Sequence, residues 1–242
     1  AVTGSNGKTT VTQMIASILR AWLGDAALAT AGNLNNHIGV PLTLMRLEPT
    51  HRSAVIEMGA NRVGDVAELV QWVRPTVAVV TNAGAEHLEG FGDLDGVARG
   101  EGEAIASLGS QGVAVINADD AYAGYWRGVA KASRILTFGQ AAAADFSARD
   151  VRQGIENGQF VTRFLLVSPG GEREVLLQVG GAHNLSNALA AAAAATAAGA
   201  SLDDVVQGLG AFRAVAGRLQ LKAGIRNSWI IDDSYNANPS SV

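Results

Sequence analysis

Apolar residues in the first 140 positions follow two patterns that alternate along the chain. Between residues 11 and 22 they recur at the i, i+3, i+4, i+7 spacing of an amphipathic helix. Four short segments are instead apolar nearly throughout, which is typical of strands buried on both faces of a parallel sheet: 53–59, 76–82, 112–119 and 134–139. Helices are predicted between them over 62–74, 95–108 and 120–131, the first ending before Pro75. This order predicts an α/β fold of P-loop type, a mostly parallel sheet with helices on both faces.

The pattern changes at about residue 144. Segments 146–151, 158–167 and 172–179 alternate more strongly between apolar and polar residues, and turn-forming residues separate them, which predicts a small antiparallel sheet. A helix is expected over 183–199, with Asn and Ser at its start and Gly199 at its end, and a shorter one over 202–211. The last stretch, 227–242, predicts a buried strand that runs into a polar loop where the sequence stops.

Composition narrows the class of protein. A hydrophobic share of 48% supports a packed core, and a net charge of −4 without a basic run argues against nucleic acid as a partner. The absence of cysteine excludes disulfides and thiolate chemistry and is consistent with a reducing cytoplasm. The alanine-rich run 188–199 is too weakly apolar, and too broken by Thr196 and Gly199, to span a membrane. We therefore expect a cytoplasmic domain without membrane insertion.

The chain opens with a candidate phosphate-binding loop, Gly4-Ser5-Asn6-Gly7-Lys8-Thr9. It carries the Gly-Lys-Thr end of the pattern G-x-x-x-x-G-K-[ST], with Val2 at the first glycine position. Glycines let the backbone curl so that N–H groups point at phosphate oxygens, and the following helix adds its positive end. Lys8 would neutralise phosphate charge and the Thr9 hydroxyl could ligate Mg²⁺. The alternative, a glycine turn with an incidental lysine, is disfavoured by the strand–loop–amphipathic helix context.

Two further polar residues fall where predicted strands end. Glu57 ends the strand 53–59, and His87 follows the strand 76–82 by a few residues. Taken alone, Glu57 could equally be a carboxylate held by an arginine or a helix N-terminus, and a lone histidine is more often structural than a ligand. Ligands bind at the carboxyl edge of open α/β sheets, however, and the loop, Glu57 and His87 all fall at that edge.

Six motifs occur in an order that resembles the Mur ligase family of bacterial peptidoglycan synthesis: GSNGKTT, GNLNNHIGVP, IEMGANRVGD, TNAGAEHLEGFG, GAHNLSNALAAAA and DDSYNANP. The resemblance implies an ATP-dependent amide ligase that uses ATP and Mg²⁺. It also implies that residues 1–214 are the central ATP-binding domain and 215–242 the start of the C-terminal domain, with the family's uridine-nucleotide-binding domain missing. Only Ala1 and Val2 precede the loop, and the chain stops in a polar loop, so we expect it to be cut at both ends.

Within the family, GNLNN and DSYNANP resemble the members whose substrates are UDP-N-acetylmuramoyl-tripeptide and D-alanyl-D-alanine. The resemblance implies that the tripeptide carboxylate attacks the γ-phosphate to give an acyl phosphate, which the D-alanyl-D-alanine amine then attacks. Such chemistry needs positioning and charge neutralisation more than covalent help from the protein. We expect a monomer, and we expect the 242-residue chain by itself to bind Mg-ATP weakly and to catalyse no ligation.

The resemblance assigns roles residue by residue. Lys8 and the loop, with Gly4, Ser5, Asn6, Gly7 and Thr10, would hold the phosphates. Thr9 and Glu57 would hold a first Mg²⁺, and His87 would belong to a second metal site. Asn184 and Asn187 match adenine contacts, Arg218 a γ-phosphate contact and Asp233 a ribose contact; N-capping is the competing role for Asn184. Asn33, Asn35 and Asn36 crowd one loop, where turn chemistry is the alternative to a substrate role.

Two departures from the family pattern stand out. The chain reads Ala85-Glu86-His87 where Glu-Ala-His is usual, which could simply re-aim a carboxylate. Glu101 aligns with a lysine that the family carbamylates to make a long-armed carboxylate near the second metal. One hypothesis is that Glu101 is a fixed, weaker substitute, acting through an intervening water. The other is that it is a solvated helix charge and the second site is impaired.

Two other functions remain open. A sister ligase of the same fold, another Mur ligase or a folylpolyglutamate synthase-like enzyme, is disfavoured by the asparagine-rich loop and by SYNANP. A nucleotide-binding module without ligase activity has Glu101 as its only support. Substrate panels would separate the sister ligases, and an activity assay would separate the inactive module.

Overall fold

A parallel sheet forms the centre of the structure, a computed structural model that describes residues 1–130, 134–141, 143–214, 217–218 and 220–234. Strands β1 (Val2–Thr3), β4 (Val77–Val80), β5 (Val113–Asn117) and β6 (Arg134–Phe138) pair in the order β1-β4-β5-β6. A second parallel pair, β2 (Ala27–Ala29) and β3 (Ser53–Val55), continues the sheet, since the Val2 N–H donates to Ile56 O at 2.9 Å. The mostly parallel sheet expected from the sequence is therefore confirmed.

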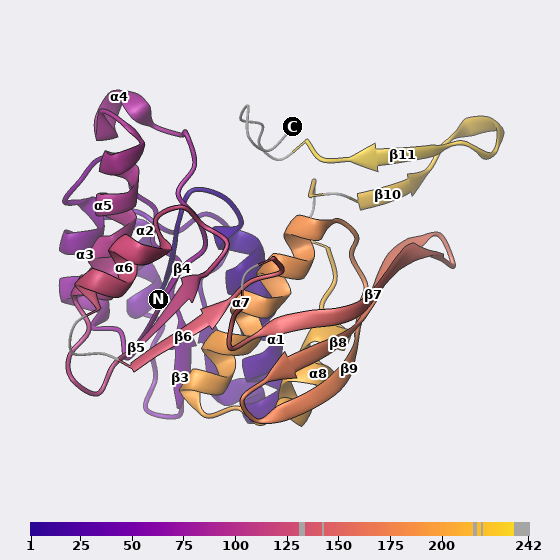
Figure 1. Ribbon diagram of the computed structural model, residues 1–242, viewed down its shortest axis with the longest axis horizontal. Helices are drawn as coiled ribbons and strands as arrows, with labels where there is room; N and C mark the ends of the chain where they lie inside the picture. Colours follow the sequence, from indigo (N-terminus) through magenta and orange to yellow (C-terminus); the bar gives the residue numbers. More distant parts are fainter. Residues whose placement is uncertain (131–133, 142, 215–216, 219, 235–242) are drawn as a thin grey trace.

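Helices cover both faces of this sheet (Figure 1). One face carries α1 (Lys8–Leu23), α7 (Ala182–Ala198) and α8 (Leu202–Ala211), and the other carries α3 (Asp65–Val73), α5 (Leu94–Ala106) and α6 (Ala123–Val129). Side chains alternate between the two cores: Val79 of β4 packs with α1 and α7, while Val80 packs with α3 and α5. Burial on both faces explains why these strands are apolar throughout.

Small residues set the layer spacing around α7. Its residues from Ala188 to Ala195 are buried, and the helix contacts α1, β4, β5 and β6. A helix that is apolar all round belongs inside a protein, which is where the alanine-rich run lies. In the part of the chain that the structure describes, no helix has the length and hydropathy needed to cross a membrane.

The second half adds the antiparallel sheet that the sequence predicts. Strands β7 (Ser147–Glu156), β8 (Gln159–Ser168) and β9 (Gly171–Leu177) pair in that order, and β9 packs against α8. Short elements that were not predicted are α2 (Gly39–Leu44), α4 (Leu88–Phe91), β10 (Gln220–Ala223) and the 3₁₀ turns Gly24–Ala26 and Ile225–Asn227.

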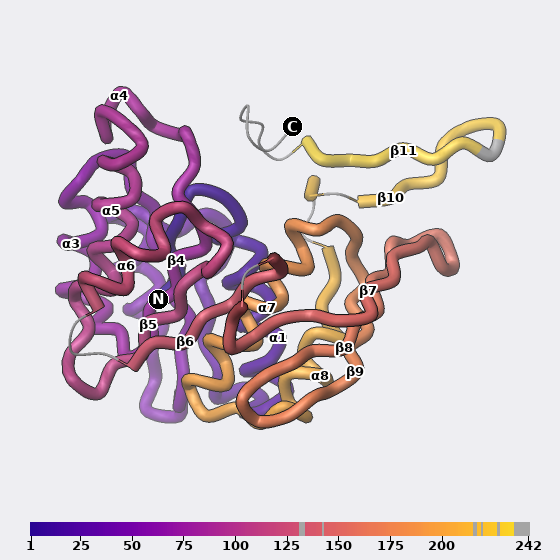
Figure 2. The backbone as a smooth tube through the Cα atoms, viewed as in Figure 1, coloured from indigo at the N-terminus to yellow at the C-terminus, as the bar shows by residue number. Residues whose placement is uncertain are grey.

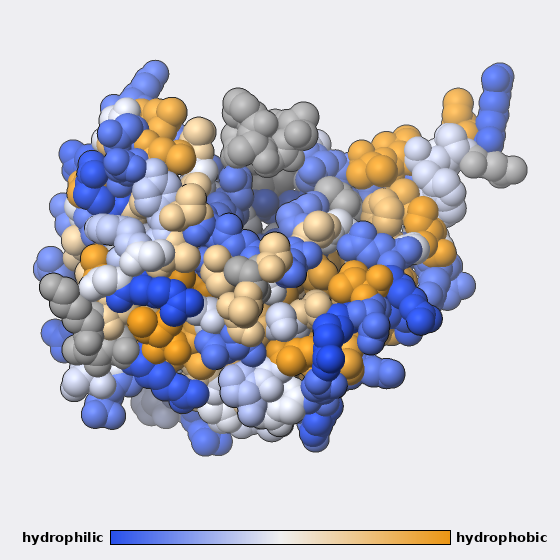
Figure 3. Space-filling model, in the orientation of Figure 1, coloured by the Kyte–Doolittle hydropathy of each residue, from blue (hydrophilic) through white to orange (hydrophobic). Residues whose placement is uncertain are grey.

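The prediction of a buried strand near the C-terminus is wrong. Strand β11 (Trp229–Asp232) forms a hairpin with β10 that extends from the main body (Figure 2), and Trp229, Ile230 and Ile231 are 52%, 55% and 58% exposed. Hydrophobic residues accordingly appear on the hairpin surface in Figure 3. The reason is that only β10 pairs with β11 among the described residues. The end of the DSYNANP motif, residues 235–239, lies outside the described residues.

The packing of α8 on α1 yields a stability prediction. A Cβ at Gly208 would lie 2.6 Å from the Ile18 backbone nitrogen, so Gly208→Ala must push α8 away from the helix that follows the phosphate loop. We expect this substitution to lower the free energy of unfolding by about 2 kcal/mol. Gly210→Ala on the same helix is the control, because its Cβ would lie 3.6 Å from Leu176 O and helix propensity favours alanine. Chemical denaturation measures both; equal effects would contradict the packing argument.

Candidate functional site

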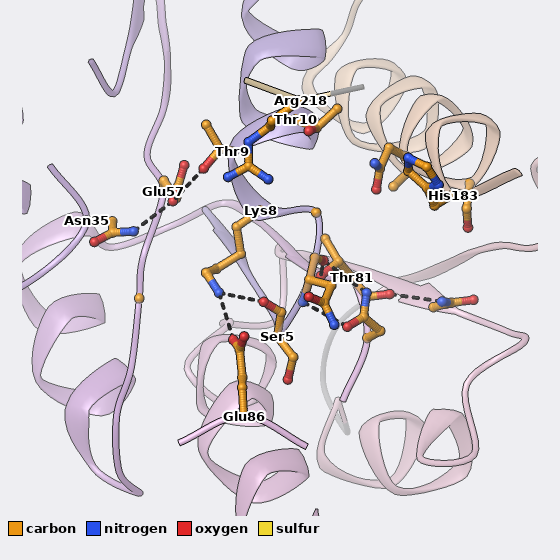
Figure 4. Close-up of a pocket in the computed structure, with 18 of the residues that line it drawn as sticks. Ser5, Lys8, Thr9, Thr10, Asn35, Glu57, Thr81, Glu86, His183 and Arg218 are labelled. Carbon is orange, nitrogen blue, oxygen red and sulfur yellow. Dashed lines mark hydrogen bonds and ion pairs between the residues drawn. The ribbon is translucent and has the colours of Figure 1, made fainter. Parts of the chain in front are cut away.

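A cavity of about 740 Å³ lies at the carboxyl edge of the parallel sheet, where β1, β3, β4 and β5 end (Figure 4). The structure brings most of the predicted site residues to it. Those that line it are Ser5, Asn6, Gly7, Lys8, Thr9, Thr10, Glu57, His87, Asn184, Asn187, Arg218 and Asp233. Gly4 and Glu101 lie outside this lining as the structure describes it; Gly4 is the first residue of the phosphate loop, and its N–H donates to Glu101.

The phosphate-binding loop, residues 4–9, follows β1 directly and leads into α1. Gly4 and Gly7 have φ angles of +123° and +86°, a region that glycine enters without strain. A Cβ at Gly4 would overlap Thr81 Oγ1 and lie 2.8 Å from the Thr81 backbone nitrogen, whereas one at Gly7 would meet only the end of the Asn187 side chain. Gly4 is therefore required by backbone conformation and by close packing, and Gly7 by its backbone conformation.

Asn82, at the end of β4, anchors the middle of the loop. Its Oδ1 accepts from the Asn6 N–H at 2.9 Å, and its Nδ2 donates to Asn6 O at 2.9 Å. Thr81 Oγ1 donates to the same carbonyl at 2.7 Å, and Asn117 Nδ2 holds Thr81 O at 2.9 Å. The sequence analysis did not single out Asn82 or Asn117, although each is a polar residue ending an apolar strand.

Lys8 folds back over the loop toward a carboxylate. Its Nζ donates to Gly4 O at 2.5 Å and to Ser5 O at 2.9 Å, and it forms an ion pair with Glu86 Oε1 at 3.3 Å. Glu86 lines the cavity (Figure 4), so the Ala85-Glu86-His87 departure does place a carboxylate against the loop lysine. His87 comes next, with φ +52° at the start of α4, and is exposed on the cavity wall.

Thr9, Glu57 and Asn35 meet on the far side of Lys8 (Figure 4). Glu57 is 1% exposed, and its Oε1 accepts from Thr9 Oγ1 at 3.2 Å and from Asn35 Nδ2 at 2.7 Å. Its other oxygen, Oε2, is buried without a hydrogen-bond partner among the described residues. The described part of the chain contains no group of three or more His, Cys, Asp or Glu side chains that could hold a metal ion. A hydroxyl and an unsatisfied carboxylate oxygen are nevertheless the type of ligand that Mg²⁺ prefers.

The asparagines of the loop after β2 divide between the two roles considered. Asn36 Oδ1 accepts from the Ile38 and Gly39 N–H groups, which is turn chemistry at the start of α2. Asn35 instead donates a hydrogen bond to the Glu57 carboxylate, and both asparagines, Asn35 and Asn36, line the cavity. Asn33 is exposed and lies outside the cavity lining as the structure describes it.

The side of the cavity formed by α7 brings together the remaining predicted residues. Asn184 Nδ2 donates to Gly180 O at 2.8 Å and its Oδ1 accepts from Asn187 at 3.3 Å, while the N-cap position of α7 is Gly181. The N-capping alternative for Asn184 is therefore wrong. His183 was not predicted; burial lowers its pKa, and the nearby Asp233 charge opposes that shift. Arg218 points into the same cavity (Figure 4).

Glu101 is 2% exposed, so the hypothesis that it is a solvated helix charge is wrong. Its Oε2 accepts hydrogen bonds from Thr3 Oγ1 and, at 2.8 Å, from the Gly4 N–H. Burial raises the pKa of Glu101, and the Lys8 charge and the two hydrogen bonds oppose that shift. The carboxylate is thus directed at the start of the phosphate loop.

The chain is similar to known proteins over most or all of its length. A family model described as the Mur ligase middle domain matches residues 2–195. The UDP-N-acetylmuramoyl-tripeptide–D-alanyl-D-alanine ligases of Escherichia coli and Haemophilus influenzae are 45% and 43% identical over the whole chain. The chain spans 52% of each of these relatives, about half their length.

Solved structures of such ligases share the fold. A crystal structure of MurF from Acinetobacter baumannii is 39% identical in sequence and superposes with a TM-score of 0.92. The match covers 99% of this chain and 51% of the Acinetobacter baumannii chain. MurF from Thermotoga maritima in complex with ADP is 28% identical with a TM-score of 0.85, and covers 99% of this chain and 54% of its own.

The anchoring of the loop by Asn82 can be tested directly. Asn82→Ala leaves the Asn6 N–H without its acceptor, and we expect a loss of about 1–3 kcal/mol in unfolding free energy. Hydrogen exchange at the Asn6 amide should also speed up. Asn61→Ala is the control, because Asn61 lines the same cavity but its side chain makes no hydrogen bond within the described residues. Unchanged exchange at Asn6 would show that the loop does not depend on Asn82.

Proposed function

The chain belongs to the Mur ligase family, and we propose that it is the ATP-binding core of an enzyme that joins D-alanyl-D-alanine to UDP-N-acetylmuramoyl-tripeptide in peptidoglycan synthesis. The observation that carries the proposal is the cavity itself. It gathers the phosphate loop, the Thr9–Glu57 pair, His87 and Arg218 at the sheet edge where α/β proteins bind ligands. The names of the relatives at 45% and 43% identity support this substrate pair over that of a sister ligase.

In the proposed reaction the tripeptide carboxylate attacks the γ-phosphate of ATP, giving an acyl phosphate and ADP. The amine of D-alanyl-D-alanine then attacks the acyl carbon and inorganic phosphate leaves. The chain's part is to position the phosphates and neutralise their charge. Lys8 would exchange its ion pair with Glu86 for phosphate oxygens, while the loop N–H groups and the start of α1 hold the rest.

The residues present fit a Mg²⁺ ion. Glu57 Oε2 is buried without a hydrogen-bond partner among the described residues, and the Thr9 hydroxyl contacts the other oxygen of the same carboxylate; both are ligands of the kind that Mg²⁺ prefers. Thr9 and Glu57 would hold the ion, which supplies further charge neutralisation on the phosphates when bound. We assign His87, exposed on the cavity wall, to a second cation.

The nucleoside would lie along α7. Asn187, whose Oδ1 packs against Gly7, and Asn184 are the proposed adenine contacts, with the unpredicted His183 beside them. Arg218 is assigned to the γ-phosphate and Asp233 to the ribose. A cytoplasmic location, a monomeric state and a division at residue 214 stay predictions of the same proposal.

Substrate-dependent phosphate release tests the proposed reaction. We expect a protein of the relatives' length that carries this chain to release phosphate from ATP only when UDP-N-acetylmuramoyl-tripeptide and D-alanyl-D-alanine are both supplied. Each substrate alone, and other amino acids in place of the dipeptide, are the controls. Release with a different acceptor would indicate a sister ligase, and ATP binding without release would indicate a nucleotide-binding module.

The Mg²⁺ assignment predicts a defect that added cation can rescue. Glu57→Gln keeps the shape of the side chain and the bond from Thr9 but removes the negative charge. We expect half-maximal nucleotide binding to need at least about tenfold more Mg²⁺, because a neutral amide is a poorer ligand for a hard cation. Titration of Mg²⁺ at fixed ATP measures the shift. Glu89→Gln, in α4 and outside the cavity lining as described, is the control; an equal response in the two variants would exclude Glu57 as the ligand.

A further inference from the structure

We propose that Glu101 is a positioning residue that fixes the start of the phosphate loop from beneath, so that the loop keeps the shape that binds phosphate. The proposal rests on the proposed nucleotide binding. It assigns to Glu101 a role carried out through Gly4 rather than by contact with nucleotide or metal.

The first observation is where the carboxylate ends. Glu101 Oε2 accepts from Thr3 Oγ1 and from the Gly4 N–H, which are the last residue of β1 and the first residue of the loop. Both contacts are buried, and the Gly4 contact joins positions 97 residues apart in sequence. A single oxygen therefore ties α5 to the point where the strand turns into the loop.

The second observation is that Gly4 is held on both sides. Its N–H donates to Glu101 below, and its carbonyl accepts from Lys8 Nζ at 2.5 Å above. With φ +123° and Thr81 filling the position of a Cβ, the residue has little freedom to rotate. Fixing the Gly4 peptide from beneath therefore also fixes the carbonyl against which Lys8 rests.

The third observation is that α5 is held closely against its neighbouring helices. Glycine stands on either side of Glu101: a Cβ at Gly100 would lie 2.5 Å from Phe91 Cε1 of α4, and one at Gly102 would lie 3.0 Å from Trp126 Cδ1 of α6. Trp126 Nε1 also donates to Ala98 O at 3.0 Å, which fixes α6 against α5. This close packing fixes the helix from which Glu101 reaches the loop.

Glu101 has two properties that can hold the loop: its negative charge, and the ability of its oxygen to accept hydrogen bonds. Burial and the neighbouring Glu86 disfavour the ionised carboxyl while Lys8 favours it, so the charge is poorly solvated here. The property that the loop requires is the hydrogen-bond acceptor. Glutamine supplies one in the same shape, whereas methionine matches the length and volume but supplies none.

Glu103 offers a matched control on the same helix. Its carboxylate accepts from the Gly64 and Ala67 N–H groups, each at 2.8 Å, and so holds the start of α3 rather than the phosphate loop. Both glutamates are in α5, and each accepts hydrogen bonds from backbone N–H groups of another segment. Only Glu101 binds an N–H group of the phosphate loop. If substitution acted only by weakening α5, both glutamates would give the same effect.

The test compares Glu101→Gln, Glu101→Met and Glu103→Met in the full chain. Binding of ADP is measured by calorimetry, and hydrogen exchange of the Gly4 amide is measured without nucleotide. We expect Glu101→Met to weaken ADP binding by about tenfold or more and to speed Gly4 exchange to a similar degree, the effect of losing a hydrogen bond to a buried acceptor. Glu101→Gln should restore both to within about threefold of the unsubstituted chain. Glu103→Met should lower the unfolding midpoint but leave ADP binding unchanged.

Three results would overturn the proposal: unchanged Gly4 exchange in Glu101→Met, equal loss of ADP binding in Glu103→Met, or failure of Glu101→Gln to restore either readout. Should Glu101→Met fail to fold, Thr3→Val removes one of the two donors, and unchanged loop exchange would then count against the proposal. If the unsubstituted chain does not bind ADP, the proposed function fails, whereas Gly4 exchange still decides the role of Glu101.

Discussion

The structure depends on one constraint, the backbone of the phosphate loop, which takes positive φ angles at Gly4 and Gly7. At Gly4 there is also no room for a side chain, because Thr81, which follows β4, fills the position of a Cβ. The loop N–H and C=O groups there are held in fixed positions by Asn82, which lines the cavity, and by Glu101, which lies outside the lining. The remaining groups of the loop and the start of α1 face the cavity, where an anion is favoured.

Small residues transmit this constraint to the rest of the fold. Alanines along α7 bring that helix onto the sheet, Gly208 brings α8 onto α1, and Gly100 and Gly102 let α5 pack against Phe91 of α4 and Trp126 of α6. Close approach of backbones leaves little space for adjustment, because protein interiors are packed to crystal-like density. The loop is therefore held by helices on opposite faces of the sheet at once, and its shape is a property of the whole layered domain rather than of the six residues that form it.

The sequence predicts the layers and most of the cavity lining, but not how the carboxylates are used. Strands buried on both faces and a Gly-Lys-Thr loop leave local signals that need no knowledge of the tertiary structure. The role of Glu101 leaves no such local signal in the sequence. A glutamate in mid-helix is buried only when its neighbours pack closely enough, and here these include Phe91 and Trp126 from other elements. The contacts of Asn82 and Glu86 likewise depend on residues that are distant in sequence. The run Trp229–Ile231 is the converse case, since its apolar composition suggested burial while the described structure leaves it exposed.

The distribution of negative charge around Lys8 shows why the loop can hold its shape while a ligand enters. Glu57 is bound by Thr9 and Asn35, Glu101 by Thr3 and Gly4, and Glu86 by Lys8. Only the last of these would compete with a phosphate for the same cation. The Lys8–Glu86 pair is also the most accessible of the three, with side chains 16% and 15% exposed. Under the proposed function, nucleotide binding therefore breaks the Lys8–Glu86 contact, and the buried carboxylates that shape the loop keep their partners.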